Sequence, residues 1–176
     1  MTQFTKRCGF TLIELIVVIT IISFLAAALL NRVPLYQEAA EKTAMEQTVG
    51  VIRSALHLQI ANYIVKGRMN DIPKLAQDNP MNWLAEKPKN YLGEFFDPGP
   101  GELPAGNWYY DLKSRELVYL VDKGKYFVAG KDGQKQIRFR LELIYNDAGP
   151  KIAAAKDEKD MEGLVLQPEP YTWKAS

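Results

Sequence analysis

The chain has 176 residues, which is enough for one domain, or for one domain with an appendage. Its formal net charge of +1 gives no bulk electrostatic reason to expect a nucleic-acid partner. A single cysteine excludes an intrachain disulfide framework. The mean hydropathy of −0.20 is that of an ordinary soluble protein, but this average is misleading because the apolar residues are concentrated near the N-terminus.

Residues 10–30 form a long apolar segment in which 17 of 21 residues are apolar. As a helix the segment would be about 31 Å long, the thickness of a bilayer's hydrocarbon core. A compact domain of this size has no need for so long a buried helix, so we predict a transmembrane helix. The nine residues before it contain Lys6 and Arg7 and no acid. The positive-inside rule therefore places the N-terminus in the cytoplasm and the remainder outside it.

A secretory signal peptide is the main alternative interpretation of this segment. Such a peptide has an apolar core of about 7–15 residues followed by a small-residue cleavage site. Here the apolar run is longer, and the alanines at 26–28 are followed by two more leucines. Both departures disfavour an ordinary signal peptide.

Glu14 is an acid within the apolar segment and needs an explanation. A carboxylate at the centre of a membrane helix costs about 2.5–3.5 kcal/mol, and snorkelling lowers that cost near a helix end. A tolerated boundary acid is one explanation. Ionisable groups in membrane segments are nevertheless functional candidates, and each calls for a named partner.

The residues around Glu14 resemble a processing motif. The string KRCGFTLIE joins a basic leader, a glycine, a phenylalanine and a glutamate five residues after the glycine, and it resembles the cleavage and methylation motif of type IV prepilins and type II secretion pseudopilins. The resemblance implies that a prepilin peptidase cuts between Gly9 and Phe10 on the cytoplasmic side and methylates the new amine of Phe10. It also implies that Glu14 neutralises this amine on a neighbouring subunit of a filament.

Cleavage after Gly9 would change the cysteine count and the net charge of the chain. The 167 residues that remain would contain no cysteine, because Cys8 lies in the leader. Their formal charge would be −1, from 20 basic and 21 acidic side chains, instead of +1 from 22 and 21. The family's C-terminal disulfide loop therefore has no counterpart here.

Residues 31–66 are predicted to continue the helix as an amphipathic segment, so that one helix runs from Phe10 to Lys66 with a kink at Pro34. Glu38 and Lys42 have the i,i+4 spacing of a surface ion pair. Gly67 is a typical helix stop. One face carries an apolar stripe that we expect the head to cover, formed by Met45, Val49, Ile52, Leu56, Ile60 and Tyr63.

Residues 67–146 are predicted to form an extracytoplasmic head. Its first part, to residue 107, is rich in proline and reads mostly as loop, with a short helix capped by Asn79. Alternating and hairpin patterns then predict an antiparallel sheet of three or four strands with one buried face, at residues 107–113, 116–122, 126–128 and 137–146.

Residues 147–176 read as a polar tail with one candidate edge strand at 164–166. The fold class is therefore α+β, in agreement with the type IV pilin-like architecture that the resemblance implies.

Sites for catalysis or for metals are not evident in the sequence. His57 is the only histidine, so a zinc site or a nucleophilic triad lacks the residues it needs. Major pseudopilins hold calcium in the head, but Asp132-Gly133 reads as a hairpin turn rather than a calcium loop. Asp157, Glu158 and Asp160 read as solvated tail. We expect no catalytic residue, no cofactor and no metal, and hence no enzyme.

The resemblance implies a subunit of a type II secretion pseudopilus or a type IV pilus, with its N-terminus cytoplasmic and its head periplasmic. Its partners would be prepilin peptidase, other pilin or pseudopilin subunits, the assembly platform of the bacterial inner membrane and the lipid bilayer, without nucleic acid. The missing cysteine pair and calcium loop favour a minor subunit. The alternative is a periplasmic binding module or enzyme on an uncleaved signal anchor.

Overall fold

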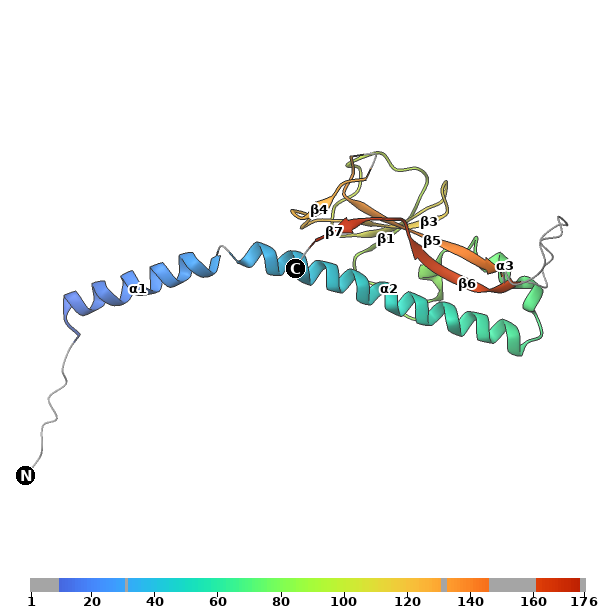
Figure 1. The fold of residues 1–176 in the computed structure, drawn as a ribbon, viewed down its shortest axis with the longest axis horizontal. Coiled ribbons are helices and arrows are strands. Elements are labelled where there is room, and N and C mark those ends of the chain that lie inside the picture. Colours follow the sequence, from blue (N-terminus) through green and yellow to red (C-terminus); the bar gives the residue numbers. More distant parts are fainter. Residues whose placement is uncertain (1–9, 31, 131–132, 146–160, 175–176) are drawn as a thin grey trace, which may run out of the picture. The chain divides into compact units, whose positions relative to one another are not determined.

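The computed structural model describes residues 10–30, 32–130, 133–145 and 161–174. The chain divides into two units, Met1–Gln37 and Glu38–Ser176, which are described separately below. Figure 1 shows the course of the chain and the labels of its elements.

Two helices occupy the segment predicted as one. Helix α1 spans Leu12–Leu30 and helix α2 spans Val33–Val65. Pro34 is the second residue of α2 and so lies in its first turn, where the N–H groups have no intrahelical partner. Asn31, between the two helices, lies outside the described residues, so the kink stays a prediction.

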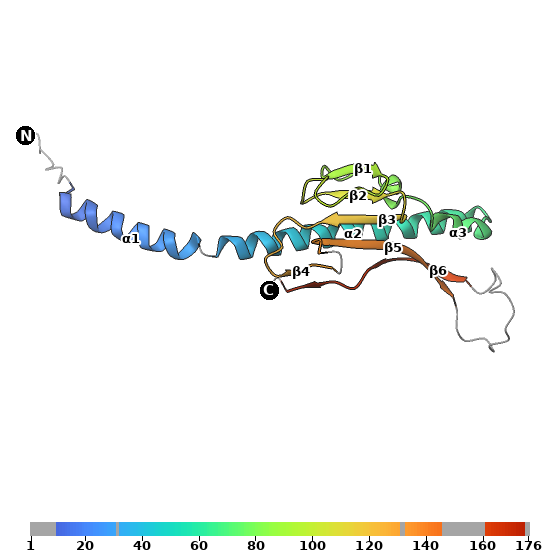
Figure 2. The same cartoon turned by 90° about the horizontal axis from the view of Figure 1, so that it is seen from above.

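The buried stripe of α2 agrees with the prediction. Met45, Val49, Ile52 and Leu56 are buried, and the next two members, Ile60 and Tyr63, are partly buried against the same core. The core on the other side is supplied by the sheet, whose strands lie along α2 in both views (Figures 1 and 2). The helix stripe and the apolar face of the sheet bury each other, as expected for an α+β head.

The main sheet has five strands in the order β1-β2-β3-β5-β6. Strand β1 is parallel to β2, and the other neighbours are antiparallel, so the sheet is mixed rather than wholly antiparallel. A separate two-stranded sheet pairs β4 with β7. The strands are β1 (Tyr91–Phe95), β2 (Trp108–Asp111), β3 (Glu116–Leu120), β4 (Phe127–Val128), β5 (Gln136–Tyr145), β6 (Met161–Pro168) and β7 (Thr172–Trp173).

Strand β1 lies in the segment that the sequence predicted mostly as loop. Gly93 has a φ of +115°, and the register with β2 shifts between Tyr91 and Glu94. Exposure still alternates along β1, but its inner positions include Gly93 and its outer positions include Leu92, so the sequence lacks the apolar alternation by which strands are recognised. The same segment contains η1 (Met69–Asp71), α3 (Ile72–Leu75) and η2 (Pro80–Trp83). The predicted cap of η2 is confirmed, because the Asn79 side chain accepts a hydrogen bond from the Met81 N–H at 3.0 Å.

The hairpin and the long alternating strand are confirmed as β2, β3 and β5. Residues 112–115 connect β2 to β3, and Arg115 has a positive φ of 57° within this short connection. On β5, Ile137, Phe139 and Leu141 are buried, as their alternation predicts.

Residues 161–174 correct the prediction of a polar tail. Strand β6 pairs with β5, and β7 pairs with β4, which buries Leu164, Leu166 and Trp173. Polar residues and two prolines separate Trp173 from Leu166 in the sequence, so the stretch after residue 166 carries little local signal. Strand β7 is recognisable only by its pairing with β4, whereas the prediction of an edge strand at residues 164–166 is confirmed by β6.

Candidate functional site

The predicted processing site lies at the start of α1. Gly9 is outside the described residues, as are Lys6, Arg7 and Cys8. Phe10 is 75% exposed. The predicted pairing of its amine with Glu14 joins two subunits, so a single chain does not contain it.

Glu14 has a local role that the sequence analysis did not consider. The hydroxyl of Thr11, which precedes α1, accepts a hydrogen bond from the Glu14 N–H at 3.3 Å. The sequence TLIE matches the capping pattern in which Thr occupies the N-cap and Glu the third helical position. A carboxylate in the first turn also interacts favourably with the positive end of the helix dipole. Glu14 therefore favours the start of α1 independently of any neighbouring subunit.

The surface of α1 is apolar on every side. No residue of α1 is buried in the structure, and its length and composition suit a membrane-crossing helix. The hydroxyl of Thr20 donates to the Ile16 carbonyl at 2.8 Å, which satisfies this polar group within the helix. A helix that is hydrophobic all round needs a bilayer or other helices around it.

The head begins with a buried acid. Glu38 is 2% exposed, and its Oε1 accepts hydrogen bonds from Trp173 Nε1 and from the Tyr126 N–H, both at 2.8 Å. The predicted ion pair of Glu38 with Lys42 is wrong, because the β4–β7 sheet covers this face of the helix and takes the carboxylate. Lys42 Nζ donates instead to the Trp173 carbonyl at 3.2 Å.

Glu41 makes a second set of contacts one turn further along α2. Its carboxylate accepts hydrogen bonds from the Tyr119 hydroxyl at 2.9 Å and from the N–H groups of Asp122 and Lys123 at 2.7 and 2.6 Å. Burial, together with the adjacent Glu41 carboxylate, raises the pKa of the Tyr119 hydroxyl. Glu38 and Glu41 thus fix the segment between β3 and β4, and the C-terminal strand, to the start of the head helix.

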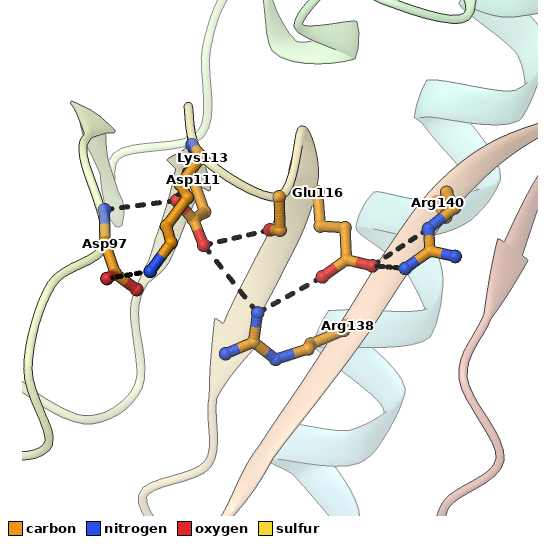
Figure 3. A network of polar contacts seen from close by, with 7 residues as sticks. Asp97, Asp111, Lys113, Glu116, Arg138 and Arg140 are labelled. Carbon is orange, nitrogen blue, oxygen red and sulfur yellow. Dashed lines mark hydrogen bonds and ion pairs between the residues drawn. The ribbon is translucent and has the colours of Figure 1, made fainter.

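A second polar network lies on the sheet face away from α2 (Figure 3). The Asp111 carboxylate accepts hydrogen bonds from the N–H groups of Asp97 and Lys113 at 3.2 and 2.9 Å, and from the Ser114 hydroxyl at 2.9 Å. Burial alone would raise the pKa of Asp111, but these donors outweigh it and the pKa is lowered. Lys113 also forms an ion pair with the Asp97 carboxylate.

Glu116 connects this network to β5. Its carboxylate accepts hydrogen bonds from Arg138 Nη1 at 3.1 Å and from Arg140 Nε at 2.9 Å. Arg138 Nη1 also lies 3.7 Å from Asp111 Oδ2, so one guanidinium bridges two acids. Acids and bases are matched within the network, which suits it to holding β2, β3 and β5 in register.

Groups that suggest a metal site are absent from the described residues, where no three His, Cys, Asp or Glu side chains are placed to hold an ion. The acids considered above as calcium ligands lie outside the described residues; they are Asp132, Asp157, Glu158 and Asp160. His57 is exposed on α2.

The comparison with known proteins identifies the N-terminal segment. Residues 4–30 match a family described as the prokaryotic N-terminal methylation motif. The matched segment contains Gly9, Phe10 and Glu14, the three residues singled out from the sequence. No significant match was found among curated proteins or among solved structures.

Proposed function

We propose that the chain is a type IV pilin-like or pseudopilin subunit, which the N-terminal methylation motif at residues 4–30 supports, and that a prepilin peptidase cuts it between Gly9 and Phe10. The same enzyme then methylates the amine of Phe10. Gly9 suits the cleavage position because it has no Cβ to obstruct the approach of a protease to the backbone. The subunit has no catalytic activity of its own and waits in the inner membrane, with its N-terminus cytoplasmic and its head periplasmic.

The observation that carries this proposal is the combination of the motif with α1. Every residue of α1 is exposed in the single chain, so the helix requires a bilayer before assembly and neighbouring helices after it. Cleavage places a positive amine at the start of this apolar helix, where an unpaired charge is costly. Glu14 of a neighbouring subunit offsets that cost and sets the register between subunits.

The exposed face of α2 supports contacts between helices beyond α1. Val51, Leu58 and Val65 are 53%, 72% and 87% exposed. Their spacing of seven residues places them in one stripe along the helix. An apolar stripe of this kind is suited to packing against the helix of an adjacent subunit on the inner-membrane assembly platform or in the filament.

The finer assignment is that of a minor subunit of a type II secretion pseudopilus or a type IV pilus. It rests on the loss of Cys8 with the leader and on the absence of a calcium-loop pattern from the sequence. A minor subunit is expected to alter the number or length of filaments without being their principal component. Electron microscopy of filaments from cells with and without the gene tests this assignment.

The mass of the protein extracted from membranes tests the proposed processing. We expect a chain that lacks nine residues and carries one added methyl group, while a Gly9→Val variant keeps its full length because the larger side chain obstructs cleavage. Retention of Cys8 in the parent chain would exclude the processing. It would favour an uncleaved anchor that carries a periplasmic binding module or an enzyme.

Replacing Glu14 by glutamine separates its two roles. Removing one partner of a buried charge pair costs about 3–5 kcal/mol, which weakens a subunit contact by at least about 100-fold. We therefore expect Glu14→Gln to be processed and inserted but to form few filaments in a shearing assay. The matched control, Thr11→Ala, removes only the cap, costs about 1 kcal/mol and leaves filaments intact. Filaments of Glu14→Gln in parental amounts would contradict the pairing.

A further inference from the structure

We propose that the exposed face of the β4–β7 sheet binds a surface of anionic lipid headgroups. We call this surface the basic face, and it consists of Lys123, Lys125, Tyr126, Val128, Thr172 and Lys174. The inference rests on the proposed function in one respect, that α1 lies in the bilayer. It adds a membrane contact made by the head.

The two-stranded sheet has one buried and one exposed side. The rings of Phe127 and Trp173 lie 5.5 Å apart at 89°, and both side chains are buried in the core. Their neighbours alternate to the other side, where Tyr126 is 44% and Val128 is 60% exposed. Lys174 is held beside Tyr126 by a hydrogen bond from its N–H to the Tyr126 carbonyl at 3.2 Å. Residues from two distant segments therefore share one outer surface.

The acidic and basic side chains around the β4–β7 sheet differ in their surroundings. Two acids of α2 are engaged in the fold, since Glu38 is buried and Glu41 accepts hydrogen bonds from three donors. Glu169 is exposed and lines the same hollow as Val128 and Thr172. Asp122 forms an ion pair with Lys123 at 2.7 Å. Lys125 and Lys174 are exposed and lack an acidic partner among the ion pairs of the described residues. Among the described residues, three lysines (Lys123, Lys125 and Lys174) face two exposed acids (Asp122 and Glu169), so the basic face keeps a surplus of one positive charge.

Tyrosine and valine between lysines are typical of a membrane interface. Lysine stems lie along apolar surface while their ammonium groups reach the phosphates, and tyrosine is enriched at the level of the headgroups. Lys125 Nζ already lies 5.5 Å from the Tyr126 ring centroid, so ring and cation are presented together. Lysines near an anionic bilayer are attracted to it within about a Debye length of roughly 8 Å.

The chain length keeps the basic face near the bilayer. Glu38, which binds Tyr126 and Trp173 directly, follows the last residue of α1 by eight positions. Eight residues span about 12 Å as a helix and at most about 28 Å when extended. The lipid surface always lies within this distance of the basic face. A soluble anion does not, which favours the lipid surface as the partner.

The test compares the full-length chain in vesicles of phosphatidylcholine alone with vesicles that also contain phosphatidylglycerol. The acetylation rate of each lysine by an amine reagent is read by peptide mass spectrometry. We expect Lys125 and Lys174 to react several-fold more slowly when the anionic lipid is present, and the protection to disappear in molar salt. Lys74 and Lys89, exposed in the segment between α2 and β1, are internal controls whose rates stay unchanged.

A variant with Lys125→Gln and Lys174→Gln extends the test. We expect the protection of Lys123 to fall with the lost attraction, whereas the matched control with Lys74→Gln and Lys89→Gln retains it. Equal rates in the two kinds of vesicle would overturn the inference, as would protection that persists in molar salt, which would indicate a protein contact. Resistance of the chain to alkaline extraction is scored in parallel. An inserted chain with unprotected lysines refutes only the lipid contact, while failure of insertion refutes the proposed function as well.

Discussion

A chain that ends before Met161 should fail to fold its head. The deletion removes Leu164, Leu166 and Trp173, which are 2%, 2% and 5% exposed. Burial of three such side chains is worth on the order of 5–9 kcal/mol, which is comparable to the whole stability of a typical domain. It also removes the partner of β5 and exposes its backbone edge. We expect loss of the cooperative thermal transition in circular dichroism and rapid proteolysis of the head.

The matched control is a chain that ends after Lys174 and therefore keeps β6 and β7. It should melt as the full-length chain does. If both truncated chains melted at the parental temperature, residues 161–174 would be a dispensable tail, as their polar sequence suggests, and the pairing with β5 and β4 would be irrelevant to stability.

Replacing Glu38 by alanine should have the largest effect of any single polar substitution in the head. The change leaves the buried Trp173 Nε1 and the partly buried Tyr126 N–H without an acceptor. Each unsatisfied donor costs about 1–3 kcal/mol, so for the two donors we expect a loss of about 2–6 kcal/mol in the free energy of unfolding. Chemical denaturation followed by tryptophan fluorescence measures it.

Two further variants isolate the cause. Glu38→Gln keeps an oxygen acceptor at the same position and should lose less stability than Glu38→Ala. Glu46→Ala changes an exposed acid on the same helix and should stay within about 0.5 kcal/mol of the parent. Equal effects of the alanine substitutions at positions 38 and 46 would show that the buried hydrogen bonds do not contribute.

These contacts link the stability of the head to its proposed membrane surface. Glu38 and Glu41 bind the backbone of the segment before β4, and Lys123 and Lys125 of the basic face are exposed on the same segment. Loss of Glu38 is therefore expected to disorder the basic face as well as to destabilise the head. Lysine protection in anionic vesicles should decrease in Glu38→Ala and persist in Glu46→Ala.

The sequence by itself determined the N-terminal part of this protein and the helical side of its core. The membrane segment follows from composition alone, and the processing motif is contained in nine consecutive residues. The stripe from Met45 to Leu56 was predictable because a helix places residues three and four apart on one face. Alternation and turn residues revealed β2, β3 and β5 for the same reason, since each signal lies within a few positions.

Only the tertiary structure decided what the C-terminal segment and the buried acids do. Glu38 and Trp173 are 135 positions apart, and Tyr119 and Glu41 are 78 apart. In the sequence, Glu38 has the spacing of a surface ion pair with Lys42, and β6 and β7 resemble a polar tail. A carboxylate becomes a core residue when distant donors surround it, and a short strand becomes stable when a partner pairs with its edge. The buried carboxylate and the short strand both depend on long-range contacts, which local periodicity and propensity do not report.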